Sequence, residues 1–305
     1  MDRNNTYIPG VTRSTIQIVA YVTMLIDHFF AILYVEYFSS PYYHYSYEFV
    51  DDDPIYAFGR NVGRIAFVLF AFMLVEGMVH TRSRARYVWR MFLLALISEI
   101  PYDLADSGKI FDFSDQSVML TLVLGACAIW IYDLYWDGKD SDLSSTTNSE
   151  GSYDGNLSGN LRLRNRIFAV AGILSCCVIA YISLCNYGFA GVLLILYLYI
   201  FRNNIYKCLG VFFAFCLAWG VNVFFAYKFS LYLSNGLITD LGSFFSHFFD
   251  IVLRNGVIAE FTGALAFVLL FQYNGAPGIR LPKALTYLFY PVQFLIFWAL
   301  KCLLF

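Results

Sequence analysis

The sequence predicts an all-α protein that crosses a membrane many times, and three observations carry this prediction. Of the 305 residues, 59% are hydrophobic and only 14% are charged, whereas soluble domains carry roughly 25% charged residues. The mean hydropathy is +0.61. The apolar residues also come in blocks whose length suits a membrane span, which needs roughly 20 mostly apolar residues. The fold class is therefore a polytopic helical bundle and not a soluble domain.

The apolar blocks predict about nine transmembrane helices within a single transmembrane domain, residues 1–305. In chain order we expect them at 14–36, 62–80, 86–105, 117–135, 166–184, 187–202, 205–227, 256–273 and 284–304. The Ser/Asn/Gly/Asp-rich segment 137–165 is expected to be a flexible cytoplasmic linker. The segment 228–255 is too mixed in polarity to span, so we expect an external loop with an interfacial helix.

The Lys and Arg residues predict how the bundle is oriented. With nine spans and a cytoplasmic N-terminus, the inner segments hold 14 of these residues and the outer ones hold six. Cytoplasmic loops carry the excess of Lys and Arg in membrane proteins. We therefore expect a cytoplasmic N-terminus and an external C-terminus. No basic tail or aromatic-interleaved basic stripe indicates nucleic-acid binding.

The first span carries Asp27 and His28 side by side in its middle, within "VTMLIDHFFAIL". A charge near the bilayer centre costs at least about 2.5–3.5 kcal/mol, so such residues have a partner, water or a function. Because neighbours on a helix point about 100° apart, one of the two can hold another span while the other faces a cavity. His28 is a candidate general base, since its ordinary pKa is near neutral. A buried structural pair is the alternative.

Two carboxylates lie four residues apart in the third span, Glu99 and Asp103, and so share a helix face. Pro101 between them breaks the helical hydrogen-bond ladder. Together with Arg64 of the second span and His28, they are expected to line a polar cavity that opens outward. Interhelical ion pairs are the alternative interpretation.

The inner end of the second span predicts a second kind of site. Glu76 and His80 lie four residues apart, and a cluster of arginines follows at Arg82, Arg84 and Arg86. Guanidinium groups match phosphate oxygens in shape and charge, which favours a site for a cytosolic phosphate-bearing cofactor. A plain topology signal would produce the same pattern. The seven cysteines show no metal-binding spacing, so no metal site is predicted.

Several stretches resemble one known family. They are "LIDHFFAIL", "GRIAFVLFAFMLVEGMVHTRSRARYVWRMFLLALISEIPYDL", "SVMLTLVLGACAI", "NYGFAGVLLILYLYIFR" and "QYNGAPGIRL…LFYPVQFLIF". On these the chain is similar to the TraX family from about residue 14 to 300, the linker excepted. The matching positions are Asp27, His28, Gly63, Arg64, Glu76, Gly77, His80, Glu99, Pro101, Asp103, Tyr187 and Gly188.

The resemblance implies an integral membrane acetyltransferase of the bacterial inner membrane that uses acetyl-CoA and whose founding activity is N-terminal acetylation of F-type pilin. Two positions depart from the family pattern: Ser117 stands where Asn is usual, and Gln293 stands where a His is usual. If that His were the family's base, this chain would be impaired, which places more weight on His28 and His80.

The sequence thus favours acyl transfer. In this hypothesis acetyl-CoA docks with its phosphates on Arg82, Arg84 and Arg86, near Glu76 and His80. His28, next to Asp27, removes a proton from an amine or hydroxyl, Glu99 or Asp103 orients it, and Arg64 holds the acids or the substrate. The acceptor is a pilin-like peptide or, alternatively, a surface glycan or lipid-linked sugar. A secondary transporter and a passive subunit of a secretion machine are the rivals from other classes, and the oligomeric state stays open.

Overall fold

The computed structural model describes residues 10–39, 53–136 and 155–305. Over these ranges the chain is helical, with only isolated bridges in place of strands. The prediction of an all-α polytopic bundle is confirmed. Seven of the described helical stretches are long and apolar enough to cross a membrane: Arg13–Tyr37, Pro54–His80, Val118–Trp136, Asn160–Ile182, Ile205–Val223, Leu241–Leu270 and Ala284–Leu304.

The described helices include four that π-helical segments prolong. They follow in the order α1 (Arg13–His28), η1 (Phe29–Tyr34), α2 (Val35–Ser39), α4 (Pro54–His80), α5 (Arg84–Asp106), α6 (Val118–Ile131), η2 (Tyr132–Trp136), α7 (Gly155–Ile182), α8 (Gly188–Ile200), α9 (Ile205–Val223), η4 (Phe224–Lys228), α10 (Phe229–Ser234), α11 (Leu241–Ile251), η5 (Val252–Ile258), η6 (Phe261–Leu265), α12 (Ala266–Leu270) and α13 (Lys283–Leu304).

The helices α5 and α8 account for the difference between about nine predicted spans and seven long apolar helices. Both occupy the places of predicted spans and pack inside the bundle, but α5 carries many charges and α8 has only 13 residues. The helix α5 also runs unbroken through Pro101. Tertiary packing supports helices here that propensity alone would interrupt.

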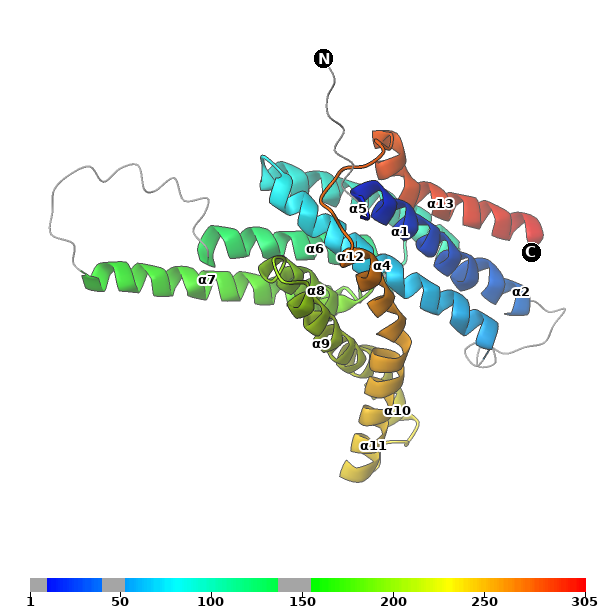
Figure 1. The fold of residues 1–305 in the computed structure, drawn as a ribbon. Coiled ribbons are helices and arrows are strands. Elements are labelled where there is room, and N and C mark those ends of the chain that lie inside the picture. Colours follow the sequence, from blue (N-terminus) through cyan, green and yellow to red (C-terminus); the bar gives the residue numbers. More distant parts are fainter. Residues whose placement is uncertain (1–9, 40–52, 137–154) are drawn as a thin grey trace, which may run out of the picture.

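Close approach of α1 and α4 forms one side of the bundle (Figure 1). Two glycines four residues apart on α4 make this possible. Gly59 lies against the ring of Phe30, and Gly63 lies against the side chain of Asp27, with no room for a Cβ atom at either position. Small residues at this spacing let membrane helices pack backbone to backbone. The glycines therefore bring the charged part of α1 directly onto α4.

The helices α5 and α13 pack together on the other side of α1, and α6 joins them to the α7–α8 half of the bundle (Figure 1). The N-terminal turn of α1 is tied to the segment before α13. Val11 N donates to Gln272 O at 2.8 Å, and Arg13 N donates to Ala276 O at 2.9 Å. The core thus lies between α1, α4, α5, α6 and α13 and encloses the cavity described below.

Two segments differ in detail from their predicted form. Residues 137–154 of the predicted linker lie outside the described residues, and the remainder of that linker begins α7. Most of the segment 228–255 is helical and forms α10, α11 and the start of η5, which project from the bundle in Figure 1. Phe224, Phe229, Phe244 and Phe248 pack together in this projection. These aromatic contacts hold η4 and α10 against α11, so that the segment forms a helical hairpin.

Candidate active site

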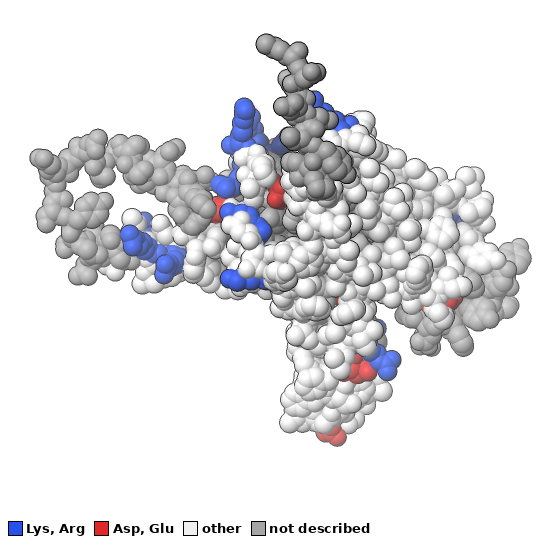
Figure 2. Space-filling model, viewed as in Figure 1, with Lys and Arg blue, Asp and Glu red and all other residues white. Residues whose placement is uncertain are grey.

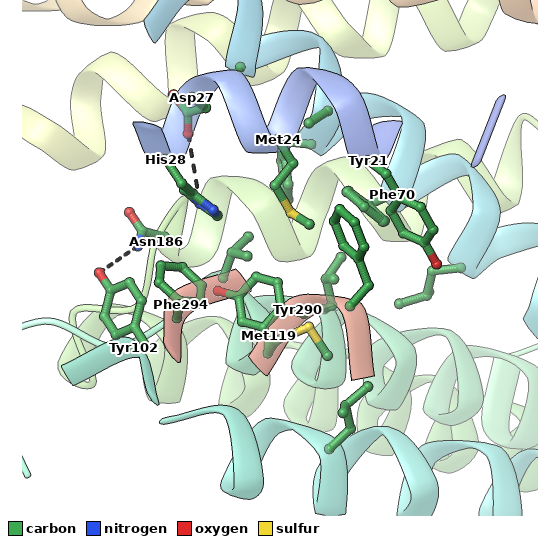
Figure 3. A pocket seen from close by; sticks show the side chains of 18 of the residues that line it. Tyr21, Met24, Asp27, His28, Phe70, Tyr102, Met119, Asn186, Tyr290 and Phe294 are labelled. Atoms are coloured by element: carbon green, nitrogen blue, oxygen red, sulfur yellow. Dashed lines mark hydrogen bonds and ion pairs between the residues drawn. The ribbon is translucent and has the colours of Figure 1, made fainter. Parts of the chain in front are cut away.

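A cavity of about 400 Å³ lies inside the bundle. It is bounded by α1, α4, α5, α6, α13 and the turn that precedes α8. On α1 the lining residues recur every three or four positions, so they occupy one face of the helix. They include Arg13, Gln17, Tyr21, Met24 and His28. Figure 3 shows Tyr21, Met24 and His28 in sequence along this face.

The cavity has two chemically different ends. One end, which we call the basic end, is lined by Arg13, Arg90, Gln17, Tyr87, Thr286 and Tyr287. The other, which we call the histidine end, is lined by His28, Asp27, Arg60, Asp106 and Asp115. Arg13 and His28 are the first and last residues of α1, a helix of 16 residues. At about 1.5 Å per residue the two ends are about 22 Å apart.

His28 projects from α1 into the histidine end, toward Tyr290 and Phe294 of α13 (Figure 3). Its ring centroid lies 4.5 Å from that of Phe294 and 6.3 Å from that of Tyr290. Nε2 faces Oδ2 of Asp27 at 3.9 Å. Nδ1 is buried and has no hydrogen-bond partner among the described residues. One ring nitrogen is thus turned to a carboxylate, and the ring as a whole faces α13.

Gln293, the residue found where the family resemblance expects a histidine, lies beside His28. It is 3% exposed. The usual family histidine and His28 would therefore share one site, formed by α1 and α13. The sequence could not show this neighbourhood, because the two helices lie at opposite ends of the chain.

Asp27 is held by an arginine from the neighbouring helix. Nη1 of Arg60 donates to Oδ1 of Asp27 at 2.7 Å, and both side chains are largely buried. The structure places Arg60 on the carboxylate next to His28, because Gly63 lets the two helices approach at this level.

Arg64 lies one turn deeper on α4 and pairs with a buried acid. Its Nε lies 3.2 Å from Oε1 of Glu260, which is 1% exposed. Its Nη1 also donates to the hydroxyl of Tyr187 at 3.3 Å. Tyr187 stacks on Phe67 and adopts the left-handed backbone conformation with φ 67°. Non-glycine residues are strained there, and such strain is common at functional sites.

Glu99 and Asp103 do not line the cavity. The carboxylate of Glu99 accepts from the backbone N and the hydroxyl of Ser117, at 2.9 and 2.7 Å. Oδ2 of Asp103 accepts from the backbone N of Asp112 at 2.9 Å. The sequence predicted that Glu99 or Asp103 orients His28. In the structure both are instead turned to the loop and to the first turn of α6, and Asp27 is the carboxylate next to His28.

The arginines predicted for the cofactor phosphates also lie away from the cavity. Nη2 of Arg84 contacts Oδ2 of Asp133 at 2.8 Å, and Asp133 is fully buried. Tyr199 donates to the same carboxylate at 2.7 Å. Arg82 and Arg86 are exposed and do not line the cavity. Arg84 therefore connects α5 to η2 through Asp133, which in turn contacts Tyr199 of α8.

Glu76 and His80 are likewise absent from the cavity lining. Glu76 accepts a hydrogen bond from the hydroxyl of Tyr273 at 3.1 Å. The side chain of His80 is 67% exposed at the end of α4. The Glu76–Tyr273 contact links α4 to the segment before α13, and His80 lies at the surface.

The sequence did not single out a polar cluster at the histidine end. Tyr102 donates to Oδ2 of Asp115 at 3.0 Å. Nδ2 of Asn186 donates to the Tyr102 hydroxyl at 3.2 Å (Figure 3). Burial raises the pKa of Asp115 to about 7, and the nearby Asp106 and Glu99 charges add to this rise. Asp115 lies in a loop. A charged residue is ordinary in a loop, so the sequence gave no reason to single it out.

A bundle of long apolar helices around a cavity with embedded charges defines a multi-pass membrane protein. The TraX protein family matches residues 12–301, and the chain belongs to this family.

The chain is also 33% identical over 79 residues to the probable fimbrial assembly protein FimC, serogroup H1, of Dichelobacter nodosus. That alignment covers 24% of this chain and 32% of the other, so the chain spans about a third of the length of this curated relative. No solved structure matches the chain significantly.

Proposed function

We propose that the protein is a membrane acetyltransferase that moves an acetyl group from cytosolic acetyl-CoA to an acceptor at or across the membrane. The observation that carries the proposal is the cavity itself, which joins a basic end to an embedded histidine about 22 Å away. Membership of the TraX family agrees with it.

The cavity fits an acyl thioester. Its middle is lined by large apolar side chains, among them Met24, Phe70, Met119 and Leu122. These suit a long and mostly apolar arm, and the volume falls within the range of small-molecule sites, about 300–1,000 Å³. At the histidine end the buried Nδ1 of His28 has no described partner. The thioester supplies an activated carbonyl carbon with a thiolate leaving group.

His28 is proposed as the general base. Because Nε2 faces Asp27, the ring proton belongs on Nε2 and the lone pair belongs on Nδ1. Nδ1 takes the proton of the acceptor N–H or O–H while the acceptor atom bonds to the carbonyl carbon and the carbon–sulfur bond breaks. The proton then passes to the departing thiolate. A positioned base of this kind contributes about 10²–10⁴-fold in rate.

Asp27 and Arg60 keep the imidazole in place. The carboxylate faces Nε2 from one side, and Arg60 fixes the carboxylate from α4. Phe294 and Tyr290 pack against the ring from α13. Three helices thus restrict His28 to a narrow range of orientations, which is what a general base requires.

The acceptor is proposed to be the N-terminal amine of a pilin-like polypeptide, with a glycan or lipid-linked sugar as the alternative. The printed name of the Dichelobacter nodosus relative refers to fimbrial assembly, which favours a polypeptide. We place the protein in the bacterial inner membrane with its N-terminus in the cytoplasm. Supporting this, Figure 2 shows basic side chains gathered near the α4–α5 turn and the start of α7.

The test is incubation of the purified protein with radiolabelled acetyl-CoA and membranes of the source cell, followed by mass spectrometry of the labelled product. We expect an added acetyl group on a membrane polypeptide, and His28→Gln should lower the rate at least about 100-fold. Label on a sugar would select the alternative acceptor. No transfer, combined with solute uptake that needs no acetyl-CoA, would overturn the proposal in favour of a transporter.

The matched control is His247→Gln, on α11 and outside the cavity lining. It removes an imidazole without touching the proposed site and should keep the wild-type rate. His80→Gln should also keep it, because His80 is exposed and absent from the cavity. Equal loss in all three variants would mean that His28 has no special role.

A further inference from the structure

We propose that Arg13 and Arg90 form the site that binds the phosphate groups of the acyl donor, at the basic end of the cavity. This inference rests on the proposed acetyl transfer and deepens it. It moves the phosphate site away from Arg82, Arg84 and Arg86, which the sequence had suggested. The ligand class is a nucleotide thioester, recognised through its phosphate oxygens.

The two arginines come from different helices and lie near the same tyrosine. Arg13 opens α1, Arg90 lies in the second turn of α5, and both are close enough to Tyr87 to act on it electrostatically. All three residues line the cavity. Two guanidinium groups that converge from separate helices can hold adjacent phosphates with charge-assisted hydrogen bonds.

These arginines lack the carboxylate partners that Arg60, Arg64 and Arg84 have. Arg60 pairs with Asp27, Arg64 with Glu260 and Arg84 with Asp133. In contrast, neither Arg13 nor Arg90 forms an ion pair with any residue that the structure describes. Two cations without a counter-ion at the mouth of a cavity attract an anionic ligand.

The backbone at Arg13 is held by hydrogen bonds on both sides, although its cation does nothing to stabilise its own helix. A cation in the first turn of a helix is unfavourable against the helix dipole. The turn is nevertheless held on both sides: Thr12 caps it, and the backbone N atoms of Arg13 and Ser14 donate to Ala276 and Pro277. Ile279 N also donates to the Ser14 hydroxyl at 3.0 Å. The fold thus holds the start of α1 firmly at the cavity mouth.

Neutral polar groups complete the basic end. Nε2 of Gln17 donates to the Tyr21 hydroxyl at 2.6 Å and to Oγ1 of Thr286 at 3.3 Å. This contact links α1 to α13 beside the arginines. Below it, Tyr21 stacks on Phe289 with 4.0 Å between ring centroids. The phosphate site is therefore followed by an apolar channel that leads toward His28. A nucleotide thioester has the same order of parts, with the phosphates first, the long arm next and the thioester last.

The experiment measures binding of coenzyme A and turnover separately. Arg13→Gln and Arg90→Gln should each raise the Kd for radiolabelled coenzyme A at least about 10-fold, because each removes a charge-assisted hydrogen bond to a phosphate. The matched controls are Arg82→Gln and Arg86→Gln, exposed on the same side but outside the cavity. They should change the Kd less than two-fold.

Acetyl-pantetheine, a thioester without phosphates, checks that the variants are folded. Its turnover should be the same in wild type, Arg13→Gln and Arg90→Gln, while the KM for acetyl-CoA rises in both variants. Unchanged coenzyme A binding in these variants, or equal losses in the Arg82 and Arg86 controls, would overturn the phosphate site and leave acetyl transfer standing. If wild type binds no coenzyme A and transfers no acetyl group, the proposed function itself fails.

Discussion

Arg60 on α4 donates to Asp27 on α1 at 2.7 Å, one residue before the embedded histidine. Both side chains are mostly buried, and Asp27 also faces Nε2 of His28 at 3.9 Å. The ion pair therefore connects helix packing to the orientation of the candidate base. Breaking it affects both stability and chemistry, and the two effects can be measured apart.

The first prediction concerns this pair. Asp27→Asn leaves the Arg60 cation without its partner and should destabilise the protein by about 1–3 kcal/mol, between the values for exposed and buried pairs. Arg60→Gln should do the same. The double variant should lose less than the sum of the two, because no charge is left unpaired. Thermal unfolding in detergent measures all three, and strict additivity would contradict the ion pair.

The second prediction concerns the close packing of α1 on α4. Gly63→Ala places a Cβ atom into the side chain of Asp27, so the helices must separate. We expect a lowered melting temperature and reduced transferase activity. Gly210→Ala, within α9 and with nothing within 4 Å of the new Cβ, is the control. It should be neutral or slightly stabilising, as alanine is the better helix former.

The third prediction separates structural carboxylates from the candidate base. Glu99→Ala leaves the buried backbone N and hydroxyl of Ser117 without an acceptor. An unsatisfied buried polar group costs about 1–3 kcal/mol, so the melting temperature should fall. His28→Gln should keep its melting temperature and lose activity. A Glu99→Ala protein as stable as wild type would show that the Ser117 contact contributes nothing.

The fourth prediction concerns pH. The pKa of Asp115 is raised by burial from its ordinary 3.8 to about 7. Between these values the folded chain keeps a proton that the unfolded chain has released, so stability falls as the pH rises through this window. Asp115→Asn cannot titrate and lacks this dependence. The melting temperature of wild type should therefore fall relative to that of the variant between pH 5 and pH 8. Parallel plots of melting temperature against pH would contradict the raised pKa.

The fifth prediction tests the proposed orientation. Cys302 is exposed near the end of α13, next to the Lys301–Glu36 ion pair of 2.9 Å. In a variant that keeps Cys302 alone, a membrane-impermeant maleimide should label it in intact spheroplasts. Labelling only after the membrane is opened would place the C-terminus inside and reverse the proposed orientation.

Much of the fold could be predicted from local sequence. The apolar blocks place the helices because burial in lipid depends on the composition of each block alone. Asp27 and His28 stand out for the same reason, since an ionisable group at that depth needs compensation. Both residues line the cavity, as does Arg64.

The roles of the other charged residues could not be read in this way. Glu99 and Asp103 are deep acids, but they accept hydrogen bonds from Ser117 and Asp112 and do not line the cavity. Arg84 lies in a basic cluster, yet it pairs with Asp133 from a different helix. The sequence shows that a charge is present at a given depth of a span. It does not show which partner that charge meets.

By itself the sequence determined an all-α membrane protein, the approximate places of its helices and the presence of costly charges within them. Only the tertiary structure decided that Asp27 meets Arg60, that Gln293 lies beside His28 and that Arg13 and Arg90 share one cavity mouth. The physical reason is that hydropathy sums over neighbours in the chain. The rotation and crossing of helices, in contrast, are set by packing between residues far apart in it, such as Gly63 against Asp27.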